Sequence, residues 1–311
     1  MKILVTGGNG QLGRCIKDSA DKYDKENKYY FFNHTELNIA DFESVCSKLD
    51  EIEPNCVINC AAYTKVDDAN GDSFNAYMVN AMGPTYLAIA CQERAIDLIH
   101  ISTDYVFDGT QTTAYKVDDK CNPINTYGAT KYCGEEAIKS IYPNAVIIRT
   151  SWLYSEYGNN FLTKTLRNID FARKNEKELE YVVDQIGCPT YARNLSDFII
   201  KELIVPQYAI DFKALRTIYH YTDEGIASRY DFAKAIERLI YVPCMNVSGS
   251  VIKGTSSDSF EDKIKRPQCC ILSKTDLVTD FATGIKDWQD SLWECATHFM
   301  TDTQLIKDIL K

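Results

Sequence analysis

An α/β fold is the class that the sequence predicts: a doubly wound parallel sheet followed by a smaller, mixed α/β C-terminal domain. Over the first half of the chain, short apolar runs rich in β-branched and aromatic residues alternate with longer helical patterns. These runs are continuous rather than alternating, which suits parallel strands that helices cover on both faces. The pattern then becomes mixed. We therefore expect one domain in residues 1–150 and a second in residues 151–311, parts of which return to the first.

The elements follow in a βαβα order, as such a sheet requires. The expected strands are short apolar runs at residues 2–5, 29–32, 57–59, 96–102 and 145–149. Between them, helical patterns occupy residues 12–22, 44–52, 73–95 and 126–140. In the second half, extended pieces at 180–183 and 217–221 alternate with helices at 195–203, 228–240 and 286–298. The stretch 245–262 is rich in Ser and Gly, so we expect a mobile loop there.

Composition narrows the class of protein. The chain has 311 residues, of which 45% are hydrophobic and 25% charged, as in an ordinary globular protein with a sizeable core. Its formal charge is −10 and it has no dense run of Lys or Arg, which argues against a nucleic-acid partner. No window approaches the roughly eighteen consecutive apolar residues of a membrane span, and a strand pattern starts directly at residue 2. We expect a cytoplasmic protein without a membrane partner.

The cysteines do not indicate a metal site. There are 12 of them, scattered without a C-x-x-C pair, and the four histidines are isolated too. Zinc sites need clustered thiolates or imidazoles. Several cysteines stand inside apolar runs, where a thiol behaves as a small hydrophobic group. We expect buried free thiols and no metal ligands.

A glycine-rich turn lies between the first strand and the first helix. Gly7, Gly10 and Gly13 have the spacing G-x-x-G-x-x-G. In dinucleotide-binding folds the first glycine permits the turn, the second lets the backbone approach a diphosphate, and the third lets helix and strand pack closely. Amide groups at the start of the helix then face the phosphates. The turn predicts a nicotinamide dinucleotide as cofactor.

The end of the second strand leaves the choice between NADH and NADPH open. An acidic residue there would bind the ribose 2′-hydroxyl, but Asn33 and His34 occupy this place. Neither excludes a 2′-phosphate, and Arg14 offers a cation that would attract one.

Three residues form a candidate catalytic group. Tyr127 and Lys131 are four positions apart in a helical pattern, so both side chains lie on one face. A free phenol has a pKa of about 10, and a neighbouring ammonium lowers it towards neutrality. We therefore expect Lys131 to lower the pKa of Tyr127, and it could also hold ribose hydroxyls. Thr103 follows a strand at the end where open α/β sheets bind ligands, and is placed to hydrogen-bond a substrate oxygen.

With these residues and several longer segments, the sequence resembles the extended short-chain dehydrogenase/reductases, and among them the dTDP-4-dehydrorhamnose reductase family. The resemblance covers nearly the whole chain. It rests on the segments 10–13, 59–67, 102–109, 127–131, 149–154, 184–190 and 265–267, and on Gly134 and Glu135. It implies a Rossmann domain for the cofactor and a C-terminal domain that mainly binds the substrate.

The resemblance also implies roles for single residues. Tyr127 would donate the proton, Lys131 would assist it and hold the ribose, and Thr103 would orient the C4 carbonyl. Besides Tyr127 and Lys131, the implied cofactor-binding residues are Gly7, Gly10, Gln11, Leu12, Gly13, Asn38, Ile39, Ala61, Ala62, Tyr63, Thr64, Asn80 and Ser102. Besides Thr103, the implied substrate-binding residues are Asp104, Tyr105, Trp152 and Arg266. The family usually has Asp where Asn38 stands. Core packing for Trp152 and surface or structural pairing for Arg266 are the alternatives.

The implied reaction is the NAD(P)H-dependent reduction of the C4 keto group of dTDP-4-dehydro-6-deoxy-L-mannose to dTDP-L-rhamnose, the last step of dTDP-rhamnose biosynthesis. Sugar-nucleotide 4,6-dehydratases have Asp-Glu after the threonine, whereas here Asp104 is followed by Tyr105, which favours reduction. Another sugar-nucleotide reductase or epimerase stays open as an alternative.

A non-catalytic alternative exists as well. The regulatory subunit of methionine adenosyltransferase is similar to this family, although the retained Thr103, Tyr127 and Lys131 favour catalysis. Some family members use Mg²⁺ between acidic C-terminal residues to form dimers, but that site cannot be matched to this chain. Monomer or homodimer, and dTDP or UDP as the nucleotide, also stay open.

Overall fold

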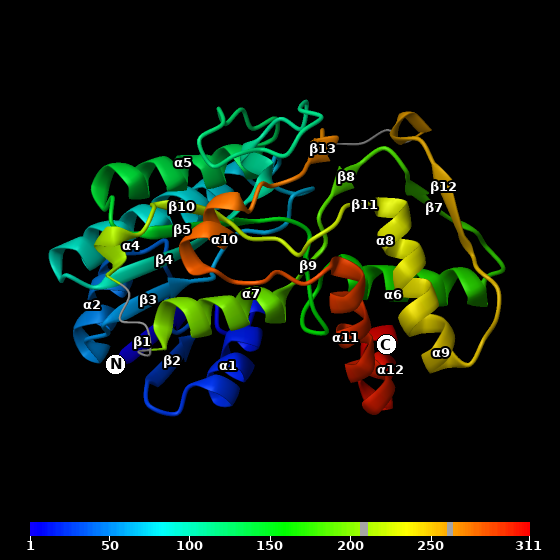
Figure 1. The fold of residues 1–311 in the computed structure, drawn as a ribbon, viewed down its shortest axis with the longest axis horizontal. Helices are drawn as coiled ribbons and strands as arrows, with labels where there is room; N and C mark the ends of the chain where they lie inside the picture. Colours follow the sequence, from blue (N-terminus) through cyan, green and yellow to red (C-terminus); the bar gives the residue numbers. More distant parts are fainter. Residues whose placement is uncertain (206–210, 260–263) are drawn as a thin grey trace.

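A six-stranded parallel sheet forms the centre of the first half of the molecule (Figure 1). The computed structural model describes residues 1–205, 211–259 and 264–311. The strand order is β10-β5-β4-β3-β1-β2, and every neighbouring pair is parallel. These strands are β1 (Lys2–Thr6), β2 (Lys28–Phe32), β3 (Cys56–Asn59), β4 (Asp97–Thr103), β5 (Val146–Thr150) and β10 (Ile218–His220). The predicted doubly wound parallel sheet is confirmed, and β10 reaches it from the second half of the chain.

Helices cover both faces of this sheet, which explains its continuous apolar strands. Ile3 and Val5 of β1 pack with α1 (Gln11–Tyr23) and α7 (Ala192–Phe198) in one core. Leu4 points to the other face, into a core with α2 (Phe42–Ile52), α4 (Gly83–Glu93) and α5 (Thr126–Ile141). Since both faces are apolar, successive side chains of one strand are all buried.

The predicted helix at 73–95 is interrupted. The structure has α3 (Ser73–Tyr77), a π-helical turn η1 (Met78–Met82) and then α4. The buried Asn80 lies in the π turn and exchanges hydrogen bonds with the backbone of Tyr63. A π turn inside a helix often marks a functional site, and here it aims an amide side chain at the segment after β3.

The second half packs around a separate core of helices. These helices are α6 (Phe161–Lys174), α8 (Arg229–Ile236), α9 (Val242–Met245), α11 (Trp288–Thr301) and α12 (Thr303–Leu310), while α10 (Thr275–Phe281) lies by β10. Small sheets surround them: β6 (Leu153–Tyr154) with β9 (Thr190–Tyr191), β7 (Leu179–Val182) with β12 (Ile252–Thr255), and β8 (Ile186–Gly187) between β11 (Ala227–Ser228) and β13 (Cys269–Cys270). Within the described part of the chain, no helix is long and apolar enough to cross a bilayer.

The prediction of a mobile loop at 245–262 is wrong for the central part of this stretch. Residues 252–255 form β12, which pairs in parallel with β7, and residues 257–259 form a 3-10 turn. The Ser257 amide and hydroxyl donate to the Asp184 carboxylate, which fixes the end of the strand. Pairing with a remote segment overrides the local Ser and Gly composition, as often happens for strands. The last part of the prediction, 260–262, lies outside the described residues.

Candidate functional site

The glycine turn at the end of β1 leaves no room for side chains. Gly7 has φ +64°, and a Cβ on it would lie 2.8 Å from the Ala61 nitrogen. A Cβ on Gly13 would lie 2.4 Å from the Gly7 carbonyl oxygen, so α1 starts directly against the turn. No side chain caps α1 at Gly10, and its first turn contains no acid. The exposed amides at this helix start suit a phosphate group.

The side chains of Gln11 and Leu12, which follow the glycine turn, face the protein. Leu12 is buried in the core under α1. The Gln11 side chain donates to the Leu153 carbonyl oxygen at 3.2 Å and accepts from Asn160 at 3.1 Å. These bonds tie the turn to the second half of the chain, so only the backbone of Gln11 and Leu12 is available to a ligand there.

The segment after β3 forms a second wall beside the turn. The Ala61 amide donates to the Thr6 hydroxyl at 3.2 Å, and the Tyr63 amide donates to Asn80 at 2.8 Å. Ala62 is half-buried and Thr64 exposed along the same segment. Behind it, Ile39 is buried against Gly83, and the Asn38 side chain accepts from the Ala40 amide within its own turn. Hydrogen bonds from backbone amides to the side chains of Thr6, Asn80 and Asn38 hold this wall.

Lys131 lies buried beneath the carboxyl end of β4. Its ammonium donates to the Ile101 carbonyl oxygen at 2.6 Å and lies 3.3 Å from His100 Nε2. Burial lowers the pKa of Lys131 to about 8. Burial, together with the Lys131 charge, also holds the pKa of His100 well below its ordinary value. His100 is therefore neutral, and the sequence patterns did not single it out.

Tyr127 meets Thr103 and Tyr105 across the end of β4. Its ring stands edge-on to Tyr105 with 5.6 Å between centroids, and its hydroxyl interacts with Thr103. The Thr103 hydroxyl donates to Asp104 at 3.1 Å and accepts from the Tyr105 amide at 3.2 Å. The structure thus brings Thr103 and Tyr127 together, with Lys131 one helical turn further along α5.

The expected lowering of the Tyr127 pKa by Lys131 is wrong for this structure. Burial is the largest influence and raises the pKa of Tyr127 above its ordinary value, and the nearby Asp104 and Tyr105 add to the increase. Only the hydrogen bond with Thr103 opposes it. The Lys131 ammonium donates to the Ile101 carbonyl oxygen and does not offset these influences on Tyr127, so the phenol stays protonated at neutral pH.

Two buried oxygens near these residues have no hydrogen-bond partner within the described part of the chain. They belong to Asp104 (Oδ2) and Ser102 (Oγ). Burial raises the pKa of Asp104 to about 7. Buried polar atoms are nearly always satisfied in folded proteins, so such orphans at a strand end are candidates to contact a ligand.

Trp152 is held in an unusual backbone conformation beside Asp104. Its φ is +47°, which is costly for a bulky residue, and its half-buried indole lies against Gly187, where a Cβ would come within 2.5 Å. The ring also meets Arg229, whose guanidinium carbon lies 3.5 Å from the ring centroid. The sequence patterns passed over Arg229, because only the pairing of β11 with β8 brings it here.

Arg266 lies further out, on a cavity of about 720 Å³ whose lining includes Gln185 and Lys265. It forms an ion pair with Asp67. A second cavity, of about 750 Å³, opens at the end of β2. Arg14, Lys17, Asn33 and Glu36 contribute to its lining, and the Arg14 guanidinium lies 3.9 Å from the Tyr157 ring. Two cations (Arg14 and Lys17) and three acids (Asp18, Asp21 and Glu36) meet in this lining.

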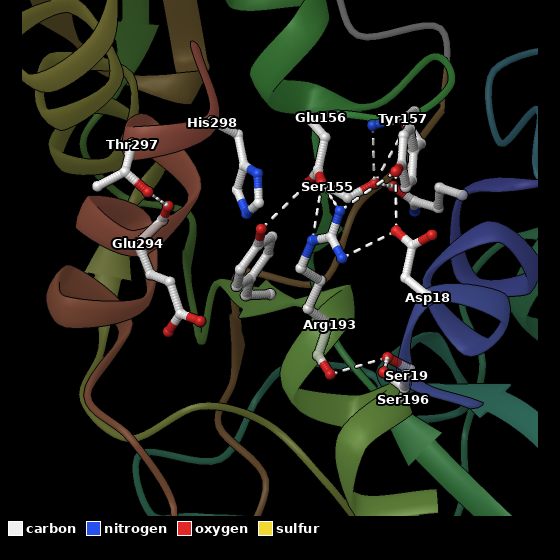
Figure 2. A network of polar contacts seen from close by, with 12 residues as sticks. Asp18, Ser19, Ser155, Glu156, Tyr157, Arg193, Ser196, Glu294, Thr297 and His298 are labelled. Carbon is white, nitrogen blue, oxygen red and sulfur yellow. Dashed lines mark hydrogen bonds and ion pairs between the residues drawn. The ribbon is translucent and has the colours of Figure 1, made fainter. Parts of the chain in front are cut away.

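No group of three or more His, Cys, Asp or Glu residues arranged for a metal occurs in residues 1–205, 211–259 and 264–311. The main cluster of acids between the two halves is instead neutralised by Arg193 of α7 (Figure 2). Its guanidinium donates to Glu156 at 2.7 Å and pairs with Asp18 of α1 at 2.8 Å. The Tyr157 hydroxyl donates to the same Asp18 at 2.8 Å.

The comparisons with known proteins agree with this geometry. The family model described as RmlD substrate binding domain matches residues 1–301. The chain is 36% identical to dTDP-4-dehydrorhamnose reductase of Aggregatibacter actinomycetemcomitans, over 94% of this chain and 97% of the relative. It is similar to the structure of a dTDP-4-dehydrorhamnose reductase from Clostridium acetobutylicum (TM-score 0.84, 35% identity, 96% of this chain and 100% of the other). The enzyme of that name from Bacillus anthracis, solved in complex with NADP, gives a TM-score of 0.83 at 34% identity, over 97% and 99% of the chains.

Proposed function

The chain belongs to the family of the RmlD substrate binding domain, and we propose that it catalyses the NAD(P)H-dependent reduction of dTDP-4-dehydro-6-deoxy-L-mannose at C4 to give dTDP-L-rhamnose. One observation carries this proposal. The hydroxyls of Thr103 and Tyr127 meet at the end of β4, in the same edge of the sheet as the glycine turn after β1. Ligands of open α/β sheets bind at this edge.

Each member of the catalytic group has a distinct task in the proposed reaction. The nicotinamide, when bound, supplies the hydride for C4. Thr103 orients the C4 carbonyl oxygen, and Tyr127 donates the proton that this oxygen gains. The raised pKa of Tyr127 keeps the phenol protonated, as a donor must be before the reaction. Lys131, whose pKa is about 8, is mostly charged at neutral pH and would hold the ribose hydroxyls of the cofactor.

We assign the remaining predicted residues by their position. The backbone of the glycine turn and of residues 61–64, with Asn38, Ile39, Asn80 and Ser102 around it, would hold the cofactor. Asp104, Tyr105 and Trp152 would contact the sugar, and Arg266 a phosphate. In this assignment residues 1–150 bind the cofactor and the rest of the chain mainly binds the substrate.

We also place the reaction in the cytoplasm. All 12 cysteines are free thiols, six of them buried, as is usual for proteins of a reducing compartment.

The proposal is tested by following nicotinamide absorbance with dTDP-4-dehydro-L-rhamnose, using NADH and NADPH in turn. Tyr127→Phe should lower kcat by about a hundredfold or more, because the proton donor is lost. Tyr132→Phe, on the same helix but outside the site, is the matched control and should keep its activity. If the wild type binds NAD(P)H but oxidises none with this substrate, the reduction is refuted, and a regulatory role becomes the better explanation.

A further inference from the structure

Arg229 is a cation at the substrate side of the site that no sequence pattern identified. It is the first residue of α8, and its backbone amide donates to the Gln185 carbonyl oxygen at 3.2 Å. Its guanidinium carbon lies 3.5 Å from the Trp152 ring and 5.0 Å from the Phe161 ring. A guanidinium stacked on an indole keeps its N–H groups at the edges, where they can donate to an anion.

Backbone contacts hold the stack in place. Trp152 lies against Gly187 of β8 and against the Arg229 guanidinium. Ser228 caps α8 through a capping box with Asp231, which fixes the backbone from which Arg229 projects. A cation that is already ordered loses little entropy when it binds a ligand.

The charge of Arg229 is favoured by Asp104 and by a hydrogen bond with Tyr105, but no carboxylate forms an ion pair with it in the described part of the chain. Arg149 and Arg193 each pair with a buried carboxylate, whereas Arg229 has no ion pair with Asp or Glu among the residues that the structure describes. Tyr105, Asp104 and Arg266 are the ionisable groups that influence the pKa of Arg229. Burial lowers this pKa, and so does the guanidinium of Arg266. The two cations therefore lie in one region, and an anion between them would relieve their repulsion.

This region lies between the reacting groups and the cavity of about 720 Å³. On one side, Tyr105 contacts the ring of Tyr127. On the other side, Gln185, which holds the Arg229 backbone, lines the cavity of about 720 Å³ together with Arg266. A sugar nucleotide whose sugar reaches Tyr127 and whose base lies in the cavity would place its linking diphosphate beside Arg229.

We propose that Arg229, stacked on Trp152, binds the diphosphate of the sugar nucleotide from the side opposite Arg266. This rests on the proposed function for the identity of the substrate. The edge of the guanidinium donates two N–H groups to phosphate oxygens, which is the geometry that makes Arg a specific ligand for phosphate. The sugar is then anchored with C4 at Thr103 and Tyr127.

The test measures binding of dTDP and of thymidine to the full chain by calorimetry, without cofactor. Arg229→Gln should weaken dTDP binding about 10- to 100-fold, the range expected for one charged hydrogen-bonding pair, and leave thymidine binding unchanged. Arg229→Lys keeps the charge but loses the paired N–H donors of the guanidinium and its stacking on Trp152. Its dTDP affinity should therefore lie between those of the wild type and Arg229→Gln. Arg238→Gln, an exposed arginine that follows the same helix, is the control and should bind dTDP like the wild type. NADPH affinity should be equal in all variants and reports that they are folded.

Unchanged dTDP binding in Arg229→Gln would overturn the proposal, and so would an equal loss for thymidine and dTDP, because the site as a whole would then be disturbed. Turnover separates this inference from the proposed function. In Arg229→Gln we expect KM for the keto sugar to rise at least about tenfold, with kcat changed by less than about threefold. If the wild type binds dTDP through Arg229 but reduces no keto sugar, the proposed function fails and the diphosphate site stands.

Discussion

Two buried charge clusters flank α5, and they are satisfied to different degrees. Arg149 and Glu135 are 2% and 0% exposed, and three hydrogen bonds of 2.7–3.1 Å join them. Asp104, which is 2% exposed, accepts from the neighbouring Thr103 on one oxygen, while its other oxygen has no partner in the described part of the chain. A buried charged group whose hydrogen bonds are all satisfied stabilises the fold. A buried carboxylate with an unsatisfied oxygen can still accept a hydrogen bond from a ligand.

The largest expected effect comes from breaking the satisfied cluster. Arg149→Met leaves Glu135 buried without its partner, so we expect the free energy of unfolding to fall by about 3–5 kcal/mol. Urea denaturation of the variant measures this. In the double variant Arg149→Met with Glu135→Leu no charge is left unpaired, and most of the stability should return. A loss below about 1 kcal/mol in the single variant would mean that this cluster is not what holds β5 to α5.

The next effect concerns Lys131, whose pKa is about 8. Above this pH, activity and stability should change in opposite directions. As pH rises above 8 the ammonium is lost, so kcat/KM for the nicotinamide cofactor should fall, approaching about tenfold per pH unit. The folded-state pKa lies below the unfolded value, so the unfolded chain binds more protons between about 8 and 10.5, and the contribution of Lys131 to stability rises over that same window.

A pH profile of Asp104→Asn is the control for this prediction. Asp104 also titrates near neutrality, with a pKa of about 7, and the variant removes that group. The fall of kcat/KM above pH 8 should remain in Asp104→Asn. If it disappears, Asp104 rather than Lys131 is responsible for it.

The sequence could predict the local features of the site but not the contacts between segments that are remote in the chain. Gly7, Gly13 and the Tyr127–Lys131 spacing are local features, and the parallel sheet follows from apolar runs, so the site edge could be located without a structure. The Arg229 stack could not, because it depends on the pairing of β11 with β8, which are remote in the chain. The Tyr127 pKa was predicted in the wrong direction, since spacing along a helix gives a face but no measure of burial.

A smaller effect is expected from the unsatisfied carboxylate itself. The pKa of Asp104 is raised, so the folded state binds more protons between about pH 4 and 7, and its stability falls as pH rises through that window. Asp104→Asn removes this loss and should be more stable than the wild type by on the order of 1 kcal/mol at pH 8, with little difference at pH 4. Thermal denaturation at both pH values measures it.

Asp108→Asn gives the opposite sign and serves as the contrast. Hydrogen bonds from Asn122, Thr110 and Tyr115 hold the pKa of Asp108 below its ordinary value. Its ionised form is therefore the stabilising one, and the variant should lose stability at pH 8. A loss in both variants would contradict the distinction between satisfied and unsatisfied carboxylates.

The smallest effect tests a single hydroxyl. Ser102 Oγ is buried without a partner among the described residues, so Ser102→Ala should change the free energy of unfolding by less than about 0.5 kcal/mol in the absence of cofactor. Thr6→Ala is the matched control, because the Thr6 hydroxyl donates to Asn59 at 2.6 Å and accepts from the Ala61 amide; it should cost about 1–3 kcal/mol. If the Ser102 hydroxyl contacts the cofactor, the melting temperatures of the wild type and of Ser102→Ala should differ only when NADPH is added. The reason is that a ligand stabilises most the protein that binds it most tightly. Equal melting temperatures with saturating NADPH would show that this orphan oxygen does not contact the cofactor.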